Sequence, residues 1–140
     1  MSTDLDPLAG QRPAPRPHDF SKPFWDGARE GKLLLQYDPV AGRHQFYPRP
    51  VSVFSGRREL EWRAACGKGT VYTYTVSHKA PPPFKNVSPF VIATVELPEG
   101  VRIMTNLINC PPDRVRIGMA VRLAWVKAGD MNFPVFEPDP

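Results

Sequence analysis

Hydrophobic and polar residues alternate most clearly near the end of the chain, between residues 115 and 125. The apolar members of this run are Val115, Ile117, Met119, Val121, Leu123 and Trp125. A period of two places alternate side chains on opposite faces of a strand, so the run predicts a strand with one buried face. Gly118 interrupts the pattern, and we therefore expect regular pairing to begin only at Ala120.

Other segments after residue 60 are also typical of strands. They are 60–65, 71–79, 90–97, 101–108 and 133–136. Segment 90–97 is almost wholly apolar, as expected of a strand that is covered on both faces. Pro98-Glu99-Gly100 predicts a tight turn before 101–108. Short connections between these strands favour an antiparallel arrangement, and together they predict a small closed barrel, of which the OB-fold is one kind.

The first third of the chain has a different pattern. Residues 1–19 are polar and broken by prolines, which predicts an extended arm or a disordered tail. Ser21 and Pro23 indicate the start of a helix, and Gly31 indicates its end. A helix of about ten residues is marginal alone in water, so its apolar side chains must pack on this chain or on a partner.

Two short strands are predicted after this helix, at 32–37 and 45–47. Prolines and glycines between and after them indicate tight turns. The whole segment 36–56 has no apolar run long enough for a core of its own. Segments this small usually need a metal ion or a neighbouring structure to hold them together.

Composition excludes several classes of protein. The chain has 18 prolines and 10 glycines among 140 residues, a fifth of the total. This fraction is below the roughly 25–30% that marks low-complexity chains. No apolar stretch is long enough to span a membrane, and the N-terminus lacks the basic start and apolar run of a signal peptide. We therefore expect a cytoplasmic protein in which Cys66 and Cys110 are free thiols.

Positive charge is concentrated in the middle of the chain. The formal net charge is +4, and residues 43–85 carry eight lysines and arginines against Glu59 and Glu61. Such a block suits a polyanion, either nucleic acid or the phosphates of a nucleotide cofactor. A solvated basic surface without a ligand is the alternative.

Motifs of catalysis are missing from the sequence. We find no nucleophile elbow, no phosphate-binding loop and no zinc-protease helix. The glycine-rich stretch 66–70 precedes a strand, and we interpret it as a strand bend. His18, His44 and His78 are scattered along the chain. We assign no catalytic residue.

Several stretches in a fixed order resemble one known family. They are SKPFWDGAREGKL (21–33), YPRP (47–50), GKGTVYTYTV (67–76), PFVIATVEL (89–97), VRIGMAV (115–121) and FPVFEP (133–138). The chain resembles the acyl-CoA-associated OB-fold family, long catalogued as a domain of unknown function. The resemblance covers about residues 17–138. It implies a mainly β fold with an N-terminal arm and helix (1–35), a rubredoxin-like zinc ribbon (36–62) and a C-terminal OB-fold barrel (63–140).

The ribbon departs from the family pattern at its metal ligands. The family has two C-x-x-C pairs, and the corresponding positions here are Asp38 and Ala41, then Ser52 and Ser55. Zinc prefers sulfur and nitrogen ligands, which alanine and serine do not supply. We therefore predict a metal-free, degenerate zinc ribbon and no permanently bound cofactor. Packing, prolines or a partner must replace the metal.

The resemblance implies an accessory, non-catalytic subunit of a thiolase-like enzyme. Such partners include β-ketothiolases, synthases and side-chain aldolases, and the expected assembly is a heteromer that processes acyl-CoA. Phe24 and Trp25 are the candidate partner interface. The candidate coenzyme A contacts are Arg63, Lys68, Lys79, Phe84 and Lys85. The proline loop 81–83 is either a cover for the acyl or pantetheine group or a plain connector.

Two other functions compete with this interpretation. An OB-fold with exposed aromatics could bind single-stranded nucleic acid, and Tyr72 and Tyr74 are expected to share one strand face. We favour nucleic acid less than a protein partner. The chain could also be an enzyme itself, an aldolase or a hydratase, with a residue such as His78 as its base.

Overall fold

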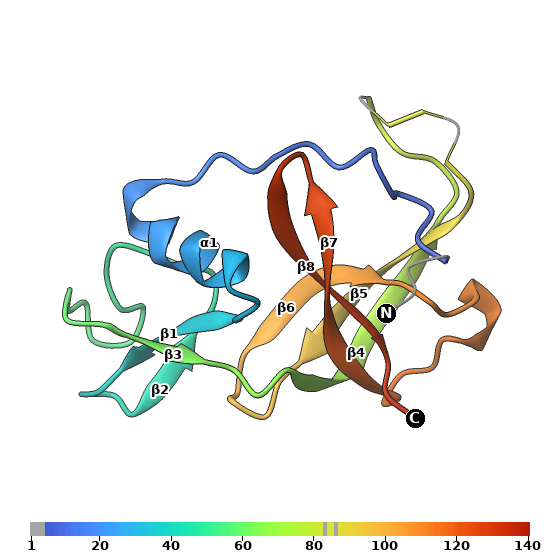
Figure 1. Cartoon of the computed structure of the whole chain (residues 1–140). Helices are drawn as coiled ribbons and strands as arrows, with labels where there is room; N and C mark the ends of the chain where they lie inside the picture. Colours follow the sequence, from blue (N-terminus) through green and yellow to red (C-terminus); the bar gives the residue numbers. More distant parts are fainter. Residues whose placement is uncertain (1–4, 83, 86) are drawn as a thin grey trace.

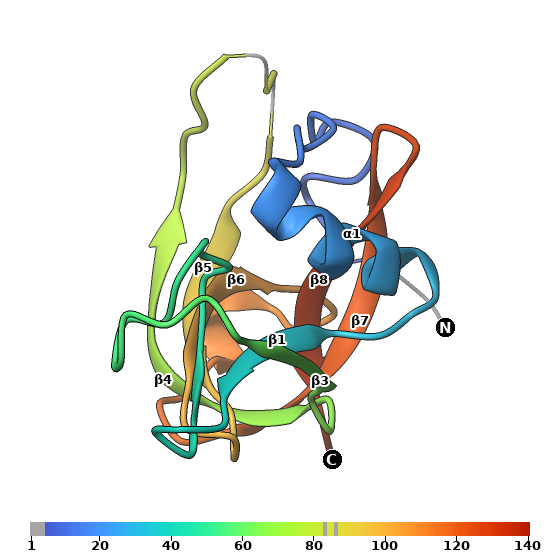
Figure 2. The same ribbon diagram turned by 90° about the vertical axis from the view of Figure 1, so that its left-hand side faces the viewer.

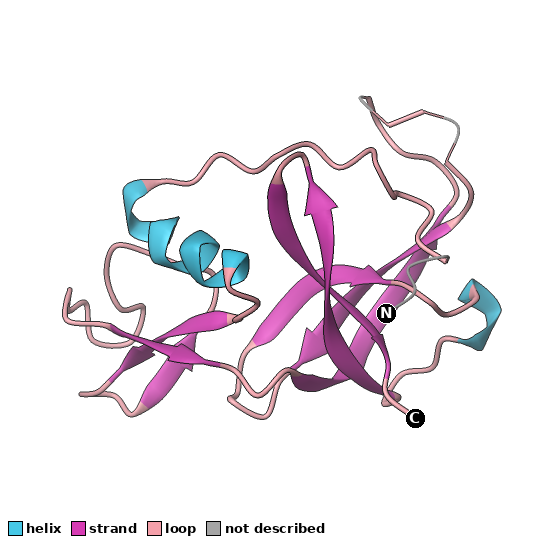
Figure 3. Ribbon diagram, in the orientation of Figure 1, coloured by secondary structure: helices cyan, strands magenta, loops and turns pink. Residues whose placement is uncertain are grey.

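The computed structural model describes residues 5–82, 84–85 and 87–140. Its first half contains the 3-10 turn η1 (Asp19–Ser21), the helix α1 (Lys22–Arg29) and the strands β1 (Leu34–Asp38), β2 (Arg43–Gln45) and β3 (Glu61–Ala64). Its second half contains β4 (Lys68–Ser77), β5 (Phe90–Glu96), β6 (Arg102–Leu107), the 3-10 turn η2 (Pro112–Arg114), β7 (Ala120–Ala128) and β8 (Met131–Pro138). Strands make up most of the regular structure of the whole chain, with α1 as its one α-helix among the described residues (Figure 3), which confirms the predicted mainly β fold class.

Five strands close into a barrel in the second half of the chain. Their order is β4-β5-β6-β8-β7, and β7 returns to pair with β4. All pairs are antiparallel except β6 with β8. A closed, five-stranded barrel of this kind is an OB-fold. β7 begins at Ala120 as predicted, because Gly118 has a φ of 88° and turns the chain just before it.

The barrel core is built by the inward residues of these strands. Val71, Val95, Val121 and Phe136 are all at most 1% exposed. A register shift between Val71 and Thr73 places Tyr74 against this core and leaves Tyr72 outside, 47% exposed. The expectation that the two tyrosines share one face is therefore wrong, because a bulge inserts an extra residue between them.

The ribbon is a separate three-stranded antiparallel sheet of order β2-β1-β3. β1 begins at Leu34 and β3 ends at Ala64, so the sheet reaches slightly beyond residues 36–62. β2 lies two residues earlier than predicted, because the turn at Gly42 (φ 67°) leads straight into Arg43. Figure 1 shows this sheet and α1 together on one side of the barrel.

Helix α1 joins the ribbon to the barrel. It follows Ser21 and stops before Gly31 (φ 75°), as predicted. The Ser21 hydroxyl does not cap α1, however, because it accepts a hydrogen bond from the His18 backbone N–H at 2.9 Å. Trp25 stacks on Phe133 of β8 across 6.3 Å between ring centroids. The helix therefore finds its packing surface within this chain.

The N-terminal arm, which the structure describes from residue 5 onward, lies along the barrel. Asp6 and Arg12 form an ion pair of 2.7 Å whose side chains are only 2% and 5% exposed. A second Arg12 nitrogen donates to Asn106 of β6 at 3.1 Å. Further along, Ala14 packs so closely that a Cβ on Gly129 would lie 2.8 Å from it. The blue trace in Figure 1 follows this path to α1. The described part of the arm is therefore an extended segment that packs on the barrel.

Membrane crossing by helices is not supported. Within the described residues, no helix has the length and apolar composition that a bilayer crossing requires.

Candidate functional site

The four ribbon positions that correspond to the family's cysteines lie together. Asp38 ends β1 and is fully buried. One of its carboxylate oxygens accepts hydrogen bonds from the Ser52 and Ser55 hydroxyls at 2.5 and 2.6 Å. The other accepts from the backbone N–H groups of Val40 and Ala41 at 2.8 and 3.0 Å. These four donors, with the Ser52 bond first among them, hold the pKa of Asp38 well below its usual range.

This arrangement does not fit a zinc ion. Ala41 has no ligand atom, and the two serines offer neutral hydroxyls in place of thiolates. The Asp38 carboxylate already accepts four hydrogen bonds. It therefore occupies the centre of the cluster itself and links the β1–β2 turn to the loop that carries the serines.

Two buried glutamines fix the same loop from the other side. Gln36 of β1 donates to the Arg49 carbonyl and accepts from the Arg49 N–H, both at 2.8 Å. Gln45 of β2 donates to Gln36 at 2.7 Å and accepts from the Val53 N–H at 2.8 Å. The sequence analysis missed both residues. Both glutamines lie within predicted strands, and a glutamine on the buried face of a strand needs hydrogen-bond partners. This requirement is the sequence feature that could have identified them.

The predicted coenzyme A contacts do not come together. Arg63 lies in the ribbon, where its guanidinium stacks 3.6 Å above the Tyr37 ring and pairs with Glu61 at 2.9 Å. Lys68 starts β4 and pairs with Asp139 at 2.7 Å. Lys79, Phe84 and Lys85 follow the far end of β4. The ten residues of β4, about 30 Å along an extended strand, lie between the two groups and place them at opposite ends of this strand. Pro83 of the predicted cover lies outside the described residues.

The two aromatic residues of α1 have different surroundings. Phe24 is only 4% exposed and packs edge-on against Phe46 at 5.8 Å. Trp25 is half-buried and lines an apolar cavity of about 260 Å³ between α1, the segment after β2, and the barrel. The ring of Phe24 therefore has almost no surface left for a partner, whereas Trp25 keeps an exposed part.

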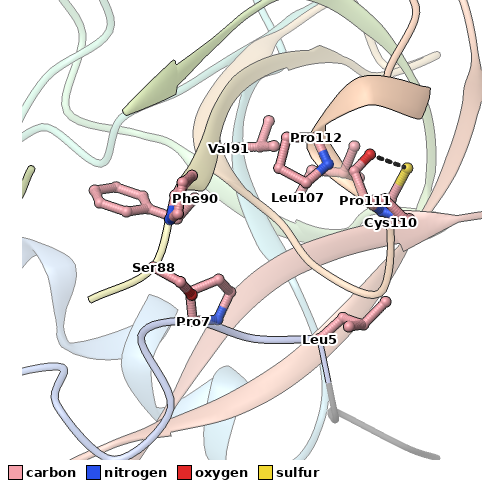
Figure 4. A pocket seen from close by; sticks show the side chains of 10 residues that line it. Leu5, Pro7, Ser88, Phe90, Val91, Leu107, Cys110, Pro111 and Pro112 are labelled. Atoms are coloured by element: carbon pink, nitrogen blue, oxygen red, sulfur yellow. Dashed lines mark hydrogen bonds between the residues drawn. The ribbon is translucent and has the colours of Figure 1, made fainter. Parts of the chain in front are cut away.

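A second apolar cavity, of about 270 Å³, lies under the N-terminal arm at one end of the barrel. Leu5 and Pro7 of the arm line it together with Phe90, Leu107 and Cys110 of the barrel end (Figure 4). Burial raises the pKa of the Cys110 thiol, which keeps it protonated and a poor nucleophile.

Catalytic groupings are not found in the described part of the chain. The His18 ring stacks on Phe20, the His44 ring packs edge-on against Tyr37, and no described histidine ring hydrogen-bonds to a hydroxyl, thiol or carboxylate. Among the same residues, no three histidines, cysteines or carboxylates gather as a metal site would require.

Comparison with known proteins agrees with this fold. Residues 62–126 match the family model described as ChsH2, C-terminal OB-fold domain. The 3-oxo-4,17-pregnadiene-20-carboxyl-CoA hydratase alpha subunit of Mycobacterium tuberculosis is 37% identical over 138 residues, which are 97% of this chain and 42% of that protein. The chain thus spans about two-fifths of that relative's length.

Two further proteins are similar to this chain over most of its length and most of their own. A DUF35 domain-containing scaffold protein of Pyrococcus furiosus is 30% identical over 109 residues, which cover 78% of this chain and 80% of that protein. A solved chain of the Ltp2-ChsH2(DUF35) aldolase is 34% identical with a TM-score of 0.79, covering 89% of this chain and 98% of that chain. The chain therefore belongs to the DUF35 family of OB-fold proteins.

Proposed function

We propose that this chain is a non-catalytic accessory subunit that scaffolds a thiolase-like enzyme acting on acyl-CoA. The observation that carries the proposal is the similarity to nearly the full length of a chain in the Ltp2-ChsH2(DUF35) aldolase, a name that joins a second protein to the DUF35 chain. The scaffold protein of Pyrococcus furiosus and the CoA hydratase alpha subunit point the same way. An aldolase, a thiolase and a synthase are all partners of the expected class.

The geometry supports a scaffold in two ways. Every described histidine ring lacks a hydrogen bond to a nucleophile, and the Cys110 thiol is kept protonated by burial. The ribbon strands and α1 instead lie together on one side of the barrel, which is the side that faces the viewer in Figure 2. Aromatic side chains of α1, of the segment after β2 and of the barrel line a cavity at this junction. A protein that offers shaped surface without a reacting group suits a supporting role.

We also propose that the ribbon works without zinc. The Asp38 cluster supports this, because a hydrogen-bonded carboxylate stands where four thiolates would converge. Metal analysis of the purified chain by mass spectrometry should find far less than one zinc per chain. A content of about one zinc per chain would contradict the proposal.

Activity assays separate a scaffold from an enzyme. The purified chain alone should not turn over an acyl-CoA. Titrated into a thiolase-like or aldolase protein encoded by a neighbouring gene, it should raise that protein's activity to a plateau. Turnover by the chain alone, or no effect on any such neighbour, would contradict the proposed function.

A further inference from the structure

Two exposed turns of the ribbon are both attached to the Asp38 cluster. They are residues 39–43, between β1 and β2, and residues 53–58, ahead of β3, and we call them together the ribbon tip. Val40 is 61% exposed and Val53 56% exposed, although both are apolar. In Figure 1 the ribbon strands lie to the left of the barrel, and the loop before β3 reaches the left edge of the molecule. Exposed apolar side chains on one surface are typical of an interaction site.

The ribbon tip is held in place from below. The Val40 N–H donates to one Asp38 carboxylate oxygen at 2.8 Å, and the Ser55 hydroxyl donates to the other at 2.6 Å. The Phe54 N–H donates to the Ser52 hydroxyl, which itself donates to Asp38. One buried carboxylate therefore sets the positions of both turns. A preorganised surface loses little conformational entropy when a partner covers it.

Positive charge accompanies the apolar residues of the ribbon tip. Between residues 39 and 58 the chain has four arginines and no lysine, aspartate or glutamate. The arginines are Arg43, Arg49, Arg57 and Arg58. In the described part of the chain none of the four forms an ion pair, and neither does Glu59, which follows them. The Arg43 guanidinium instead stacks 4.0 Å above the Phe54 ring. These charges are therefore available to carboxylates on another molecule.

A protein fits this surface better than a nucleic acid does. Protein interfaces are enriched in arginine and aromatic residues and depleted in lysine, and the ribbon tip has the same composition. Val40 and Val53 can pack into apolar recesses of a protein, whereas valine offers a base neither an aromatic ring for stacking nor a hydrogen bond. Unpaired arginines beside apolar side chains complement an apolar recess that carries carboxylates.

We propose that the ribbon tip is the surface on which the partner enzyme docks, and that the partner covers it with an apolar recess ringed by aspartates and glutamates. The choice of partner rests on the proposed function, and the position and charge of the interface come from the ribbon tip. The Asp38 cluster then has a second role, because it presents Val40 and Val53 to the partner. Attraction between unlike charges makes this association weaken as salt rises.

Reversal of charge at the ribbon tip tests the proposal. The probe is the thiolase-like or aldolase protein encoded by a neighbouring gene, titrated with this chain by isothermal titration calorimetry at low and at high salt. Arg57→Glu/Arg58→Glu should weaken binding at least about tenfold and reduce its dependence on salt. Arg16→Glu/Arg114→Glu makes the same change in net charge at two exposed arginines outside the ribbon tip. This control should weaken binding less than about threefold.

Val53→Asp tests the apolar part of the same surface. The substitution puts a charge under the partner and should weaken binding at least about tenfold. Its control is Ile117→Asp, at a residue 69% exposed just before β7, which should change the Kd less than about threefold. All the substituted side chains are exposed, so we expect each variant to fold, and thermal melts check this.

The outcomes separate the docking surface from the scaffold role. If Arg57→Glu/Arg58→Glu and Val53→Asp weakened partner binding no more than their controls do, the ribbon tip would not be the docking surface, and the scaffold role would stand. If the unmodified chain bound no such neighbour, the proposed function would fail and the docking surface with it. Saturable binding of a fluorescein-labelled oligothymidylate that Arg57→Glu/Arg58→Glu abolishes, with partner binding unaffected, would assign the surface to nucleic acid and overturn the proposal.

Discussion

Asp38 shows how a single residue can hold a small sheet together without a metal. Its carboxylate is fully buried, and its charge is stabilised by two hydroxyls and two backbone N–H groups. These donors lower its pKa from the ordinary value of 3.8. The stability that the charged form contributes is therefore present above pH 3.8 and is lost as pH falls through the lowered value.

Asp38→Asn should make this contribution visible. At pH 7 the variant should melt at least about 4 °C below the unmodified chain, because an amide offers one acceptor where the carboxylate offers two. The difference should shrink below about pH 4, where the carboxylate of the unmodified chain begins to lose its advantage. Circular dichroism melts between pH 7 and pH 2.5 provide the measurement.

Asp26→Asn is the control for that experiment. Asp26 also has a lowered pKa, through its hydrogen bond with Lys22, but its side chain is 47% exposed. Its loss should change the melting temperature little at any pH. An Asp38→Asn variant that behaves like Asp26→Asn would contradict the role of the buried carboxylate.

Part of the Asp38 cluster could be predicted before the structure was known. The four positions 38, 41, 52 and 55 came from the resemblance to the family's ribbon, and the structure places them together. The acceptor role of Asp38 was not predicted, because it depends on a fold that brings Ser52 and Ser55 to the end of β1. The coenzyme A set was chosen from the basic middle of the chain and from the proline loop with Phe84, and neither feature contains information on how β4 separates these residues in space.

At the scale of elements, local sequence patterns predicted most strands and the helix correctly. β5 follows from an almost wholly apolar run, and the start of β7 follows from apolar alternation and from Gly118, which interrupts it. The sequence pattern did not predict the bulge in β4, because an extra residue can be inserted without a change in composition. It also did not predict the length of β8, which pairs with β7 over eight positions although only 133–136 stood out as apolar.

A variant of the ribbon with cysteine at all four positions of the Asp38 cluster should bind zinc. The variant Asp38→Cys/Ala41→Cys/Ser52→Cys/Ser55→Cys restores two C-x-x-C pairs at positions that the structure brings together. It should bind about one zinc per chain and melt at a higher temperature with zinc than with a chelator. Failure to bind zinc in a folded variant would contradict the convergence of the four positions. The double variant Asp38→Cys/Ala41→Cys, with only one pair, is the control.

The N-terminal arm should be part of the folded unit. Arg12→Ala leaves the buried Asp6 carboxylate without its partner, and breaking such a pair costs about 3–5 kcal/mol of unfolding free energy. Urea denaturation at pH 7 measures the loss. Asp6→Asn/Arg12→Met should lose less than Arg12→Ala, since no unpaired charge remains. If Arg12→Ala changed the free energy of unfolding by less than about 0.5 kcal/mol, the ion pair with Asp6 would not be needed to hold the arm on the barrel.

At the scale of the whole molecule, the junction between the ribbon and the barrel is the distinctive feature. Trp25 of α1 packs there on Phe133 of the barrel, and Phe24 of the same helix packs edge-on against Phe46. No periodicity along the sequence predicted this surface, because its residues come from α1, the ribbon and the barrel. The nucleic-acid alternative is not favoured, since Tyr74 packs on the core and Arg102 covers Tyr72.

The most direct test of the scaffold role is the mass of the assembly. The chain is co-expressed with a thiolase-like or aldolase protein from a neighbouring gene, and the purified material is measured by size-exclusion chromatography with light scattering. The account predicts a single peak that contains both proteins, with a mass well above the 15.7 kDa of this chain. Separate elution, with this chain as a monomer beside each such neighbour, would contradict it.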